Sequence, residues 1–142
     1  MCIFDVESGT VEYAIEKTAS EWKKQLTSLQ YYVLREAGTE RSFTSSLNEN
    51  KKNGLYVCAA CETPLYNSDH KFDSGTGWPS FSNSLPGAFK TKTDYSHGVE
   101  RVEYHCAKCG AHHGHVFNDG PEITGKRFCN NGLCLIFKPD NN

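Results

Sequence analysis

The chain has 142 residues with 15 basic and 17 acidic side chains, a length typical of one domain and a net charge of -2. Leucine, isoleucine, valine and phenylalanine make up only 28 of the 142 residues, close to the level at which disorder is expected. The low net charge and 17 aromatic side chains argue against disorder. Seven cysteines accompany this thin core, which indicates a fold held by metal or disulfides as well as by burial.

The sequence excludes several classes of protein. Its longest apolar run, Leu133 to Phe137, is far shorter than the roughly 20 residues that span a bilayer. The acidic N-terminus is unlike a signal or transit peptide, and no Asn-x-Ser/Thr acceptor occurs. An odd number of cysteines also disfavours a disulfide framework, so we expect a cytoplasmic protein with reduced thiols. The lack of a basic stripe predicts no nucleic-acid partner.

The N-terminal part of the chain is expected to be an acidic arm followed by two short helices. Residues 1–19 lack clear periodicity, apart from a short strand predicted from Val11 to Ile15. Ser20 is placed to cap the first helix, and Thr27-x-x-Gln30 is typical of a capping box that opens the second. Gly38 stands where that second helix should end. We expect the helices to form a clasp on a β domain.

The domain is expected to span residues 20–142, and most of it consists of short β-like segments. A polar loop is predicted over residues 39–53. Leu55 to Cys58 and Leu133 to Phe137 are apolar segments, and apolar and polar side chains alternate from Val102 to Cys106. The sequence therefore predicts a mainly β fold.

Two Cys-x-x-Cys pairs, Cys58/Cys61 and Cys106/Cys109, are separated by 44 residues. A two-residue gap lets both sulfurs of a pair turn toward one ion, and two pairs complete the closed tetrahedral shell of a structural zinc. Gly110 suits the tight turn after the second pair. The alternatives are two separate redox dithiols or buried cysteines. We expect one zinc ion per chain, which would link strands that are distant in the sequence.

His112 and His115 are candidates for acid–base chemistry because histidine titrates near neutral pH. Their spacing also suggests a catalytic zinc site, but Gly114 disfavours the helix that such a motif needs. The other alternative is a pair of structural histidines near a turn.

Cys129 is the candidate nucleophile. In an extended segment, Arg127, Cys129 and Asn131 share one face. A neighbouring cation lowers the pKa of a thiol and increases its nucleophilic thiolate form, and an amide can donate to a substrate oxygen. The alternative for a lone cysteine is an inert, small apolar side chain.

These motifs resemble the type B methionine sulfoxide reductases in their zinc-binding form, which are specific for the R epimer of the sulfoxide. The resemblance covers the chain from about Ala19 to Phe137 and includes both cysteine pairs. Its other motifs occur in the expected order at Ser20 to Arg41, Gly75 to Phe81, Ser96 to Gly98, His112 to Pro121 and Arg127 to Asn131.

The resemblance implies two antiparallel β-sheets in a tent-like or barrel-like domain, with short N-terminal helices and a structural zinc site made of four cysteines. It also implies that Cys129 attacks the sulfoxide sulfur and becomes a sulfenic acid as methionine leaves. His112, His115 and Asn131 would position the sulfoxide oxygen and help to protonate it.

Further residues are implied to bind the substrate. Trp78 would contact the sulfoxide methyl group, and a role in the core is an alternative that is compatible with this. Asp94 is expected to orient the histidine network, and Phe117 and Arg127 would complete the substrate site.

The chain departs from the family pattern at Thr76, where many members carry the resolving cysteine. Recycling of the sulfenic acid must then use another thiol or direct attack by an external reductant. Cys2 is the first candidate for the resolving thiol, with a spectator role as the alternative. Cys134 is expected to pack in the core, and His113 and Gly132, which replace a usual Leu and Ser, are not expected to abolish activity.

The expected substrates are oxidised proteins or free methionine R-sulfoxide, and the expected reductant is thioredoxin or a similar thiol donor. We expect a monomer with no membrane partner. One rival hypothesis is a non-enzymatic zinc module that binds protein or RNA. Another is a thiol–disulfide oxidoreductase that uses a Cys-x-x-Cys pair.

Overall fold

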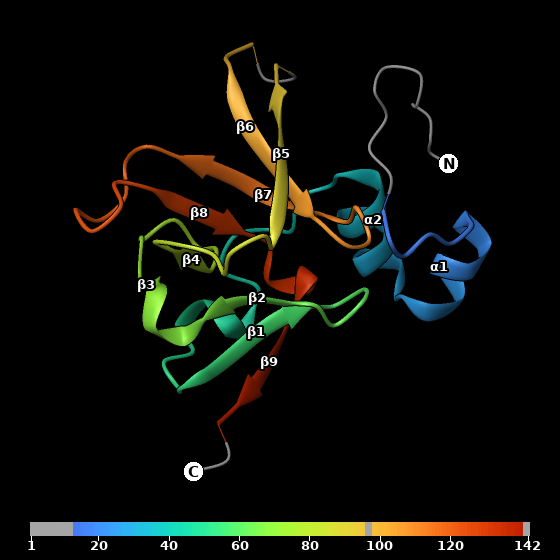
Figure 1. The fold of residues 1–142 in the computed structure, drawn as a ribbon, viewed down its shortest axis with the longest axis horizontal. Coiled ribbons are helices and arrows are strands. Elements are labelled where there is room, and N and C mark those ends of the chain that lie inside the picture. The colour runs from blue at the N-terminus through green and yellow to red at the C-terminus, as the bar shows by residue number, and fades with distance from the viewer. Residues whose placement is uncertain (1–12, 96–97, 141–142) are drawn as a thin grey trace.

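The computed structural model describes residues 13–95 and 98–140, which form two antiparallel β-sheets (Figure 1). The smaller sheet has the strand order β2-β1-β9 and contains β1 (Gly54–Cys58), β2 (Pro64–Asn67) and β9 (Leu135–Pro139). The larger sheet has the order β3-β4-β8-β7-β6-β5. Its strands are β3 (Lys71–Phe72), β4 (Ser80–Phe81), β5 (Phe89–Asp94), β6 (Arg101–Cys106), β7 (His112–Phe117) and β8 (Arg127–Asn130). The predicted mainly β fold is confirmed.

All helical segments in the described part of the chain are short. They are α1 (Ala19–Gln25), α2 (Ser28–Glu36), and the 3-10 turns η2 (Ser46–Glu49), η3 (Ser68–His70) and η4 (Gly132–Cys134). None of these helices has the length and apolar character of a membrane span.

The start of α1 differs from the prediction. Thr18, not Ser20, is the N-cap: its hydroxyl accepts a hydrogen bond from Glu21 N–H at 3.2 Å, and Glu21 Oε1 accepts one from Thr18 N–H at 2.8 Å. This capping box satisfies two backbone donors at once, so the helix begins before Ser20. The predicted box of Thr27 and Gln30 at the start of α2 is confirmed.

The end of α2 also shifts by one residue. Ala37 adopts the left-handed conformation with φ 57°, and Gly38 N–H donates to Tyr32 O at 2.9 Å. A tyrosine ring lies where a side chain at Gly38 would point, because a Cβ there would be 2.2 Å from it. Gly38 thus leaves room for the exposed Tyr32 ring, whereas Ala37 makes the left-handed turn.

Two other predicted segments need correction. The apolar segment from Leu133 begins as turn η4, where Cys134 N–H donates to Asn131 O at 3.1 Å, so the strand starts only at Leu135. Tyr13 to Ile15 form no strand, although Ile15 N–H donates to Lys108 O at 3.0 Å, and Val11 and Glu12 lie outside the described residues. The polar loop contains the 3-10 turn η2.

The two α-helices clamp the turns that carry the cysteine pairs, which confirms the predicted clasp. Trp22 is buried, and the Arg35 guanidinium lies 4.6 Å from the centre of its ring. Arg35 also donates to Cys109 O at 2.9 Å, and Gln25 donates to Ala60 O at 2.6 Å. Each helix therefore contacts one cysteine turn.

Strands β7 and β8 lie unusually close together at Gly114. The register pairs Gly114 with Asn130 and His115 with Cys129. A Cβ at Gly114 would stand 1.9 Å from the Cys129 carbonyl oxygen, so only glycine fits there. This approach sets His115 directly across from Cys129.

Candidate active site and metal centre

Cys129 lines a pocket of about 460 Å³ over the adjacent strands β7 and β8 of the larger sheet. Among the residues predicted to act on a substrate, six line this pocket: Trp78, His115, Phe117, Arg127, Cys129 and Asn131. Thr76, at the position of the family's resolving cysteine, also lines it. Side chains that are far apart in the sequence therefore meet at one cavity.

The surroundings of Cys129 influence its ionisation in opposite directions. Burial raises the pKa of the thiol, while the positive charge of Arg127 and hydrogen bonding from Thr76 lower it. The predicted effect of Arg127 is present, but burial outweighs it. Thr76 is thus close enough to the nucleophile to stabilise its thiolate.

Arg127 is held in place from two sides. Its Nε and Nη2 donate to the two carboxylate oxygens of Asp119 at 2.9 and 3.1 Å. Its guanidinium lies 4.4 Å from the centre of the Phe117 ring. This fork and stacking fix the cation that acts on Cys129. Asp119 received no role from the sequence, because the pair forms only when the loop after β7 folds back on β8.

Each predicted catalytic histidine is paired with a carboxylate. His115 Nε2 lies 2.9 Å from Asp94 Oδ2, and His112 Nδ1 lies 2.7 Å from Glu103 Oε2. Burial lowers the pKa of His115, and the hydrogen bond with Asp94 opposes this effect. The two imidazole centres are 5.8 Å apart, but His112 is buried behind the pocket and does not line it.

Glu103 is a further residue that the sequence did not single out. Its Oε2 also lies 3.0 Å from His105 Nε2, so one carboxylate oxygen serves two imidazoles. Burial raises the pKa of Glu103, but hydrogen bonds from His105 and His112 outweigh burial and hold it well below its ordinary value. A buried anion next to His112 favours the Nδ1–H tautomer of that ring.

Asn131 and Trp78 are both anchored by Glu40. Asn131 lies just after β8 and not within it, and its Oδ1 accepts the Glu40 N–H at 2.9 Å. Trp78 Nε1–H donates to Glu40 O at 3.0 Å. The Glu40 side chain is buried, and its Oε1 accepts Leu133 N–H at 2.8 Å. Glu40 lies within a stretch that carried the family resemblance, but no local pattern indicated its function.

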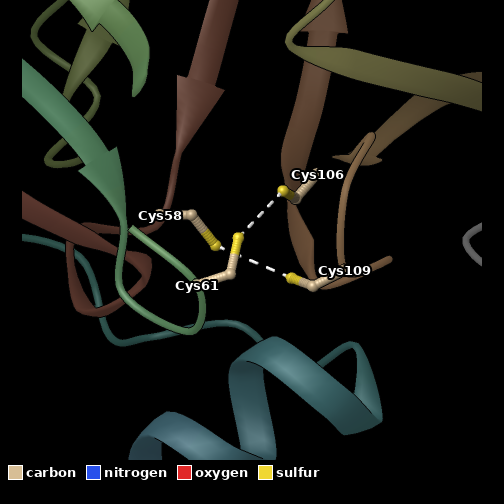
Figure 2. Close-up of side chains that lie close together, drawn as sticks. All are labelled: Cys58, Cys61, Cys106 and Cys109. Carbon is tan, nitrogen blue, oxygen red and sulfur yellow. Dashed lines mark hydrogen bonds between the residues drawn. The ribbon is translucent and has the colours of Figure 1, made fainter. Parts of the chain in front are cut away.

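The four paired cysteines form one cluster between the β1–β2 turn and the β6–β7 turn (Figure 2). All four sulfurs lie within 4.8 Å of one another; Cys58 Sγ is 3.9 Å from Cys109 Sγ, and Cys61 Sγ is 3.6 Å from Cys106 Sγ. A tetrahedral ion with metal–sulfur bonds of about 2.3 Å would separate its sulfurs by about 3.8 Å. The cluster therefore fits a four-coordinate metal ion, and the sulfurs are too far apart for disulfides.

The remaining cysteines differ in position. Cys134 is fully buried, and its Sγ donates to His112 O at 3.4 Å, which agrees with the predicted packing role. Cys2 lies outside the described residues, so its role as a resolving thiol stays a prediction.

The domain is mainly β and carries a four-cysteine cluster that fits a metal ion. Its pocket combines a cysteine with an arginine and a histidine–carboxylate pair. These features together are those of a thiol-dependent oxidoreductase. The SelR domain model matches residues 26–139. The chain belongs to this family, the type B peptide methionine sulfoxide reductases.

Several curated relatives with the name peptide methionine sulfoxide reductase MsrB are similar over most of the chain. The Alteromonas mediterranea protein is 53% identical over 123 residues, which are 86% of this chain and 87% of that protein. The Methanosarcina barkeri protein is 52% identical over 89% of this chain and 90% of its own length. The Leptospira interrogans protein is 49% identical over 92% of this chain and its entire length.

Proposed function

We propose that this protein reduces methionine R-sulfoxide to methionine by attack of the Cys129 thiolate on the sulfoxide sulfur. The observation that carries this proposal is the meeting of Cys129, His115 and Trp78 in one pocket. The family relationship favours this activity over a zinc module without enzymatic function or an oxidoreductase that uses a Cys-x-x-Cys pair.

In the proposed reaction, the Cys129 sulfur loses two electrons and the sulfoxide sulfur gains them. The sulfoxide oxygen ends on Cys129 as a sulfenic acid, and methionine leaves. A thiol then attacks the sulfenic sulfur to form a disulfide and water, and a dithiol such as thioredoxin reduces that disulfide. Trp78 would offer its ring to the sulfoxide methyl group.

The developing charge on the sulfoxide oxygen needs hydrogen-bond donors. The Asn131 amide uses one N–H on His113 O at 3.0 Å, and we propose that its second N–H donates to the sulfoxide oxygen. Because Nε2 of His115 faces Asp94, Nδ1 is the atom of that ring that can deliver a proton. His112 does not line the pocket, and its Nδ1 faces Glu103, so we propose that it supports His115 from behind rather than contacting the substrate.

The direct test is a reductase assay with dithiothreitol and methionine R-sulfoxide, with the S epimer as a substrate control. We expect Cys129→Ser to abolish turnover. Cys134→Ser is the matched control, because a serine hydroxyl can keep the hydrogen bond to His112 O and the residue lies outside the pocket. Full activity of Cys129→Ser would refute the proposed mechanism.

We also propose that the four-cysteine cluster holds one zinc ion with a structural role. Four thiolates would fill its coordination shell, so no position would remain for a substrate. Such an ion would link two turns that belong to different sheets. Elemental analysis of the purified protein tests this; one zinc per chain is expected, and absence of metal would refute it.

Further proposals concern the setting of the reaction. We propose that residues 20–142 form the reductase domain and residues 1–19 an acidic arm. We also propose a thioredoxin-like donor, oxidised proteins or free methionine sulfoxide as substrates, and a cytoplasmic monomer. Size-exclusion chromatography with light scattering tests the monomer.

A further inference from the structure

His113 is a buried histidine of β7 that belongs to neither the pocket nor the four-cysteine cluster. Its side chain is fully buried. A buried imidazole is costly unless both ring nitrogens find partners, so the two contacts of this ring show what it does. One nitrogen, Nε2, lies 3.3 Å from Cys58 Sγ, and the other, Nδ1, lies 3.3 Å from Asn130 Nδ2.

The orientation of Asn130 determines where the His113 proton lies. Asn130 Oδ1 accepts hydrogen bonds from the hydroxyls of Tyr66 and Tyr104 at 2.8 and 3.1 Å. Its Nδ2 also donates to Asn131 O at 2.9 Å, so the amide group is fixed with its nitrogen toward His113. An amide nitrogen only donates, and His113 Nδ1 must therefore accept.

The proton of a neutral His113 ring consequently lies on Nε2, where it points at the sulfur of Cys58. We propose that His113 is an outer-sphere residue of the metal centre, which donates its Nε2–H to the Cys58 thiolate and slows loss of the metal. This inference rests on the proposed metal ion. Hydrogen bonds to metal ligands orient them and typically change metal affinity by roughly 10–100-fold.

The hydrogen bond would act on the ligand in two ways. It withdraws electron density from the Cys58 sulfur, which makes the thiolate a poorer target for protons and oxidants. It also fixes the sulfur of Cys58, a fully buried residue at the end of β1. Figure 2 shows this sulfur facing the other three.

The test is the rate of zinc transfer from the holoprotein to the coloured chelator 4-(2-pyridylazo)resorcinol. His113→Leu removes both ring nitrogens at similar size, and we expect zinc release roughly 10–100-fold faster than from wild type. His113→Gln retains one side-chain N–H donor and should fall between the two. Leu65→Ala, which truncates a fully buried apolar side chain, controls for a loss of stability without loss of a polar contact.

A second measurement does not depend on a substitution. Nitrogen-edited NMR of histidine-labelled wild-type protein distinguishes the tautomers, and we expect the Nε2–H form at His113. The Nδ1–H form would overturn the inference. In the cobalt-substituted protein, His113→Leu should shift the sulfur-to-cobalt charge-transfer band to lower energy.

The outcomes separate the two proposals. A wild-type chain without zinc that also takes up no cobalt would refute the metal centre itself. A zinc-loaded wild type that releases its ion at the same rate as His113→Leu would refute only the role of His113.

Discussion

Glu40 offers a sharp test of how the active site is held, because its charge and its hydrogen bond can be removed separately. Glu40→Ala deletes the acceptor of Leu133 N–H, whereas Glu40→Gln keeps an acceptor and removes the charge. An unsatisfied buried donor costs about 1–3 kcal/mol, so Glu40→Ala should lower the free energy of unfolding by about that amount. For a chain of this size, that corresponds to a fall in Tm of roughly 3–10 °C.

Glu40→Gln should behave differently, and its effect should depend on pH. Burial raises the pKa of Glu40 above its ordinary value of 4.5, so the folded protein binds this proton more tightly than the unfolded chain does. Wild-type stability is then lost as pH rises from about 4.5 through the folded pKa. The glutamine variant has no titratable group at this position, so its stability does not fall in this way. The free energy of unfolding of Glu40→Gln relative to wild type should therefore increase with pH over this range.

Urea unfolding at constant zinc concentration over a series of pH values measures both effects. Glu36→Gln, an exposed glutamate at the end of α2, controls for the change in net charge. The negative charge of Glu40 also raises the pKa of Cys129, so Glu40→Gln should lower the pKa of this thiol. The rate of Cys129 alkylation as a function of pH, followed by mass spectrometry, measures this change. The reasoning fails if Glu40→Gln loses as much stability as Glu40→Ala.

Three other expectations address the nucleophile, the metal and recycling. Arg127→Met should raise the pKa of Cys129, because it removes the neighbouring positive charge, and move the pH profile of kcat/KM to higher pH. A nearby opposite charge shifts a pKa by about 1–3, so kcat/KM at neutral pH should fall roughly tenfold or more. Lys126→Met is the exposed control, and an unshifted profile would contradict the role of Arg127. Chelation of the metal under reducing conditions should lower Tm, measured by calorimetry, by about 10 °C or more, because metal binding is coupled to folding. An unchanged Tm in the metal-free protein would refute a stabilising role of the metal. Cys2→Ser should slow thioredoxin-coupled turnover but not turnover with dithiothreitol. If the variant and the wild type have the same thioredoxin-coupled rate, Cys2 has no part in the mechanism.

The sequence predicted those parts of the site that depend on local spacing. Two residues between Cys58 and Cys61 are enough to indicate a metal ligand pair, whatever the surrounding fold. The alternation that brings Arg127 and Cys129 to one face is likewise a property of a single strand. Such features need no knowledge of distant contacts.

Features that depend on distant contacts could not be predicted in this way. Glu40 and Asn131 are 91 residues apart, and no local pattern links a buried carboxylate to an amide across that separation. Local competition explains the misplaced start of the first helix, because Thr18 and Ser20 are both good N-caps and Glu21 decides for Thr18. The apolar segment from Leu133 could equally form a strand or a buried turn, and the Asn131 carbonyl selects the turn.

The position of the cysteine cluster has a consequence for the order of folding events. In the unfolded chain, closing the segment of 44 residues between Cys61 and Cys106 costs about 3 kcal/mol of chain entropy, apart from a constant. Each cysteine pair can nevertheless bind an ion locally before the two sheets meet. An ion captured by one pair has open positions that a second chain can fill, so we expect metal added before refolding to cross-link molecules at high concentration. Metal added after the sheets have formed meets all four sulfurs together.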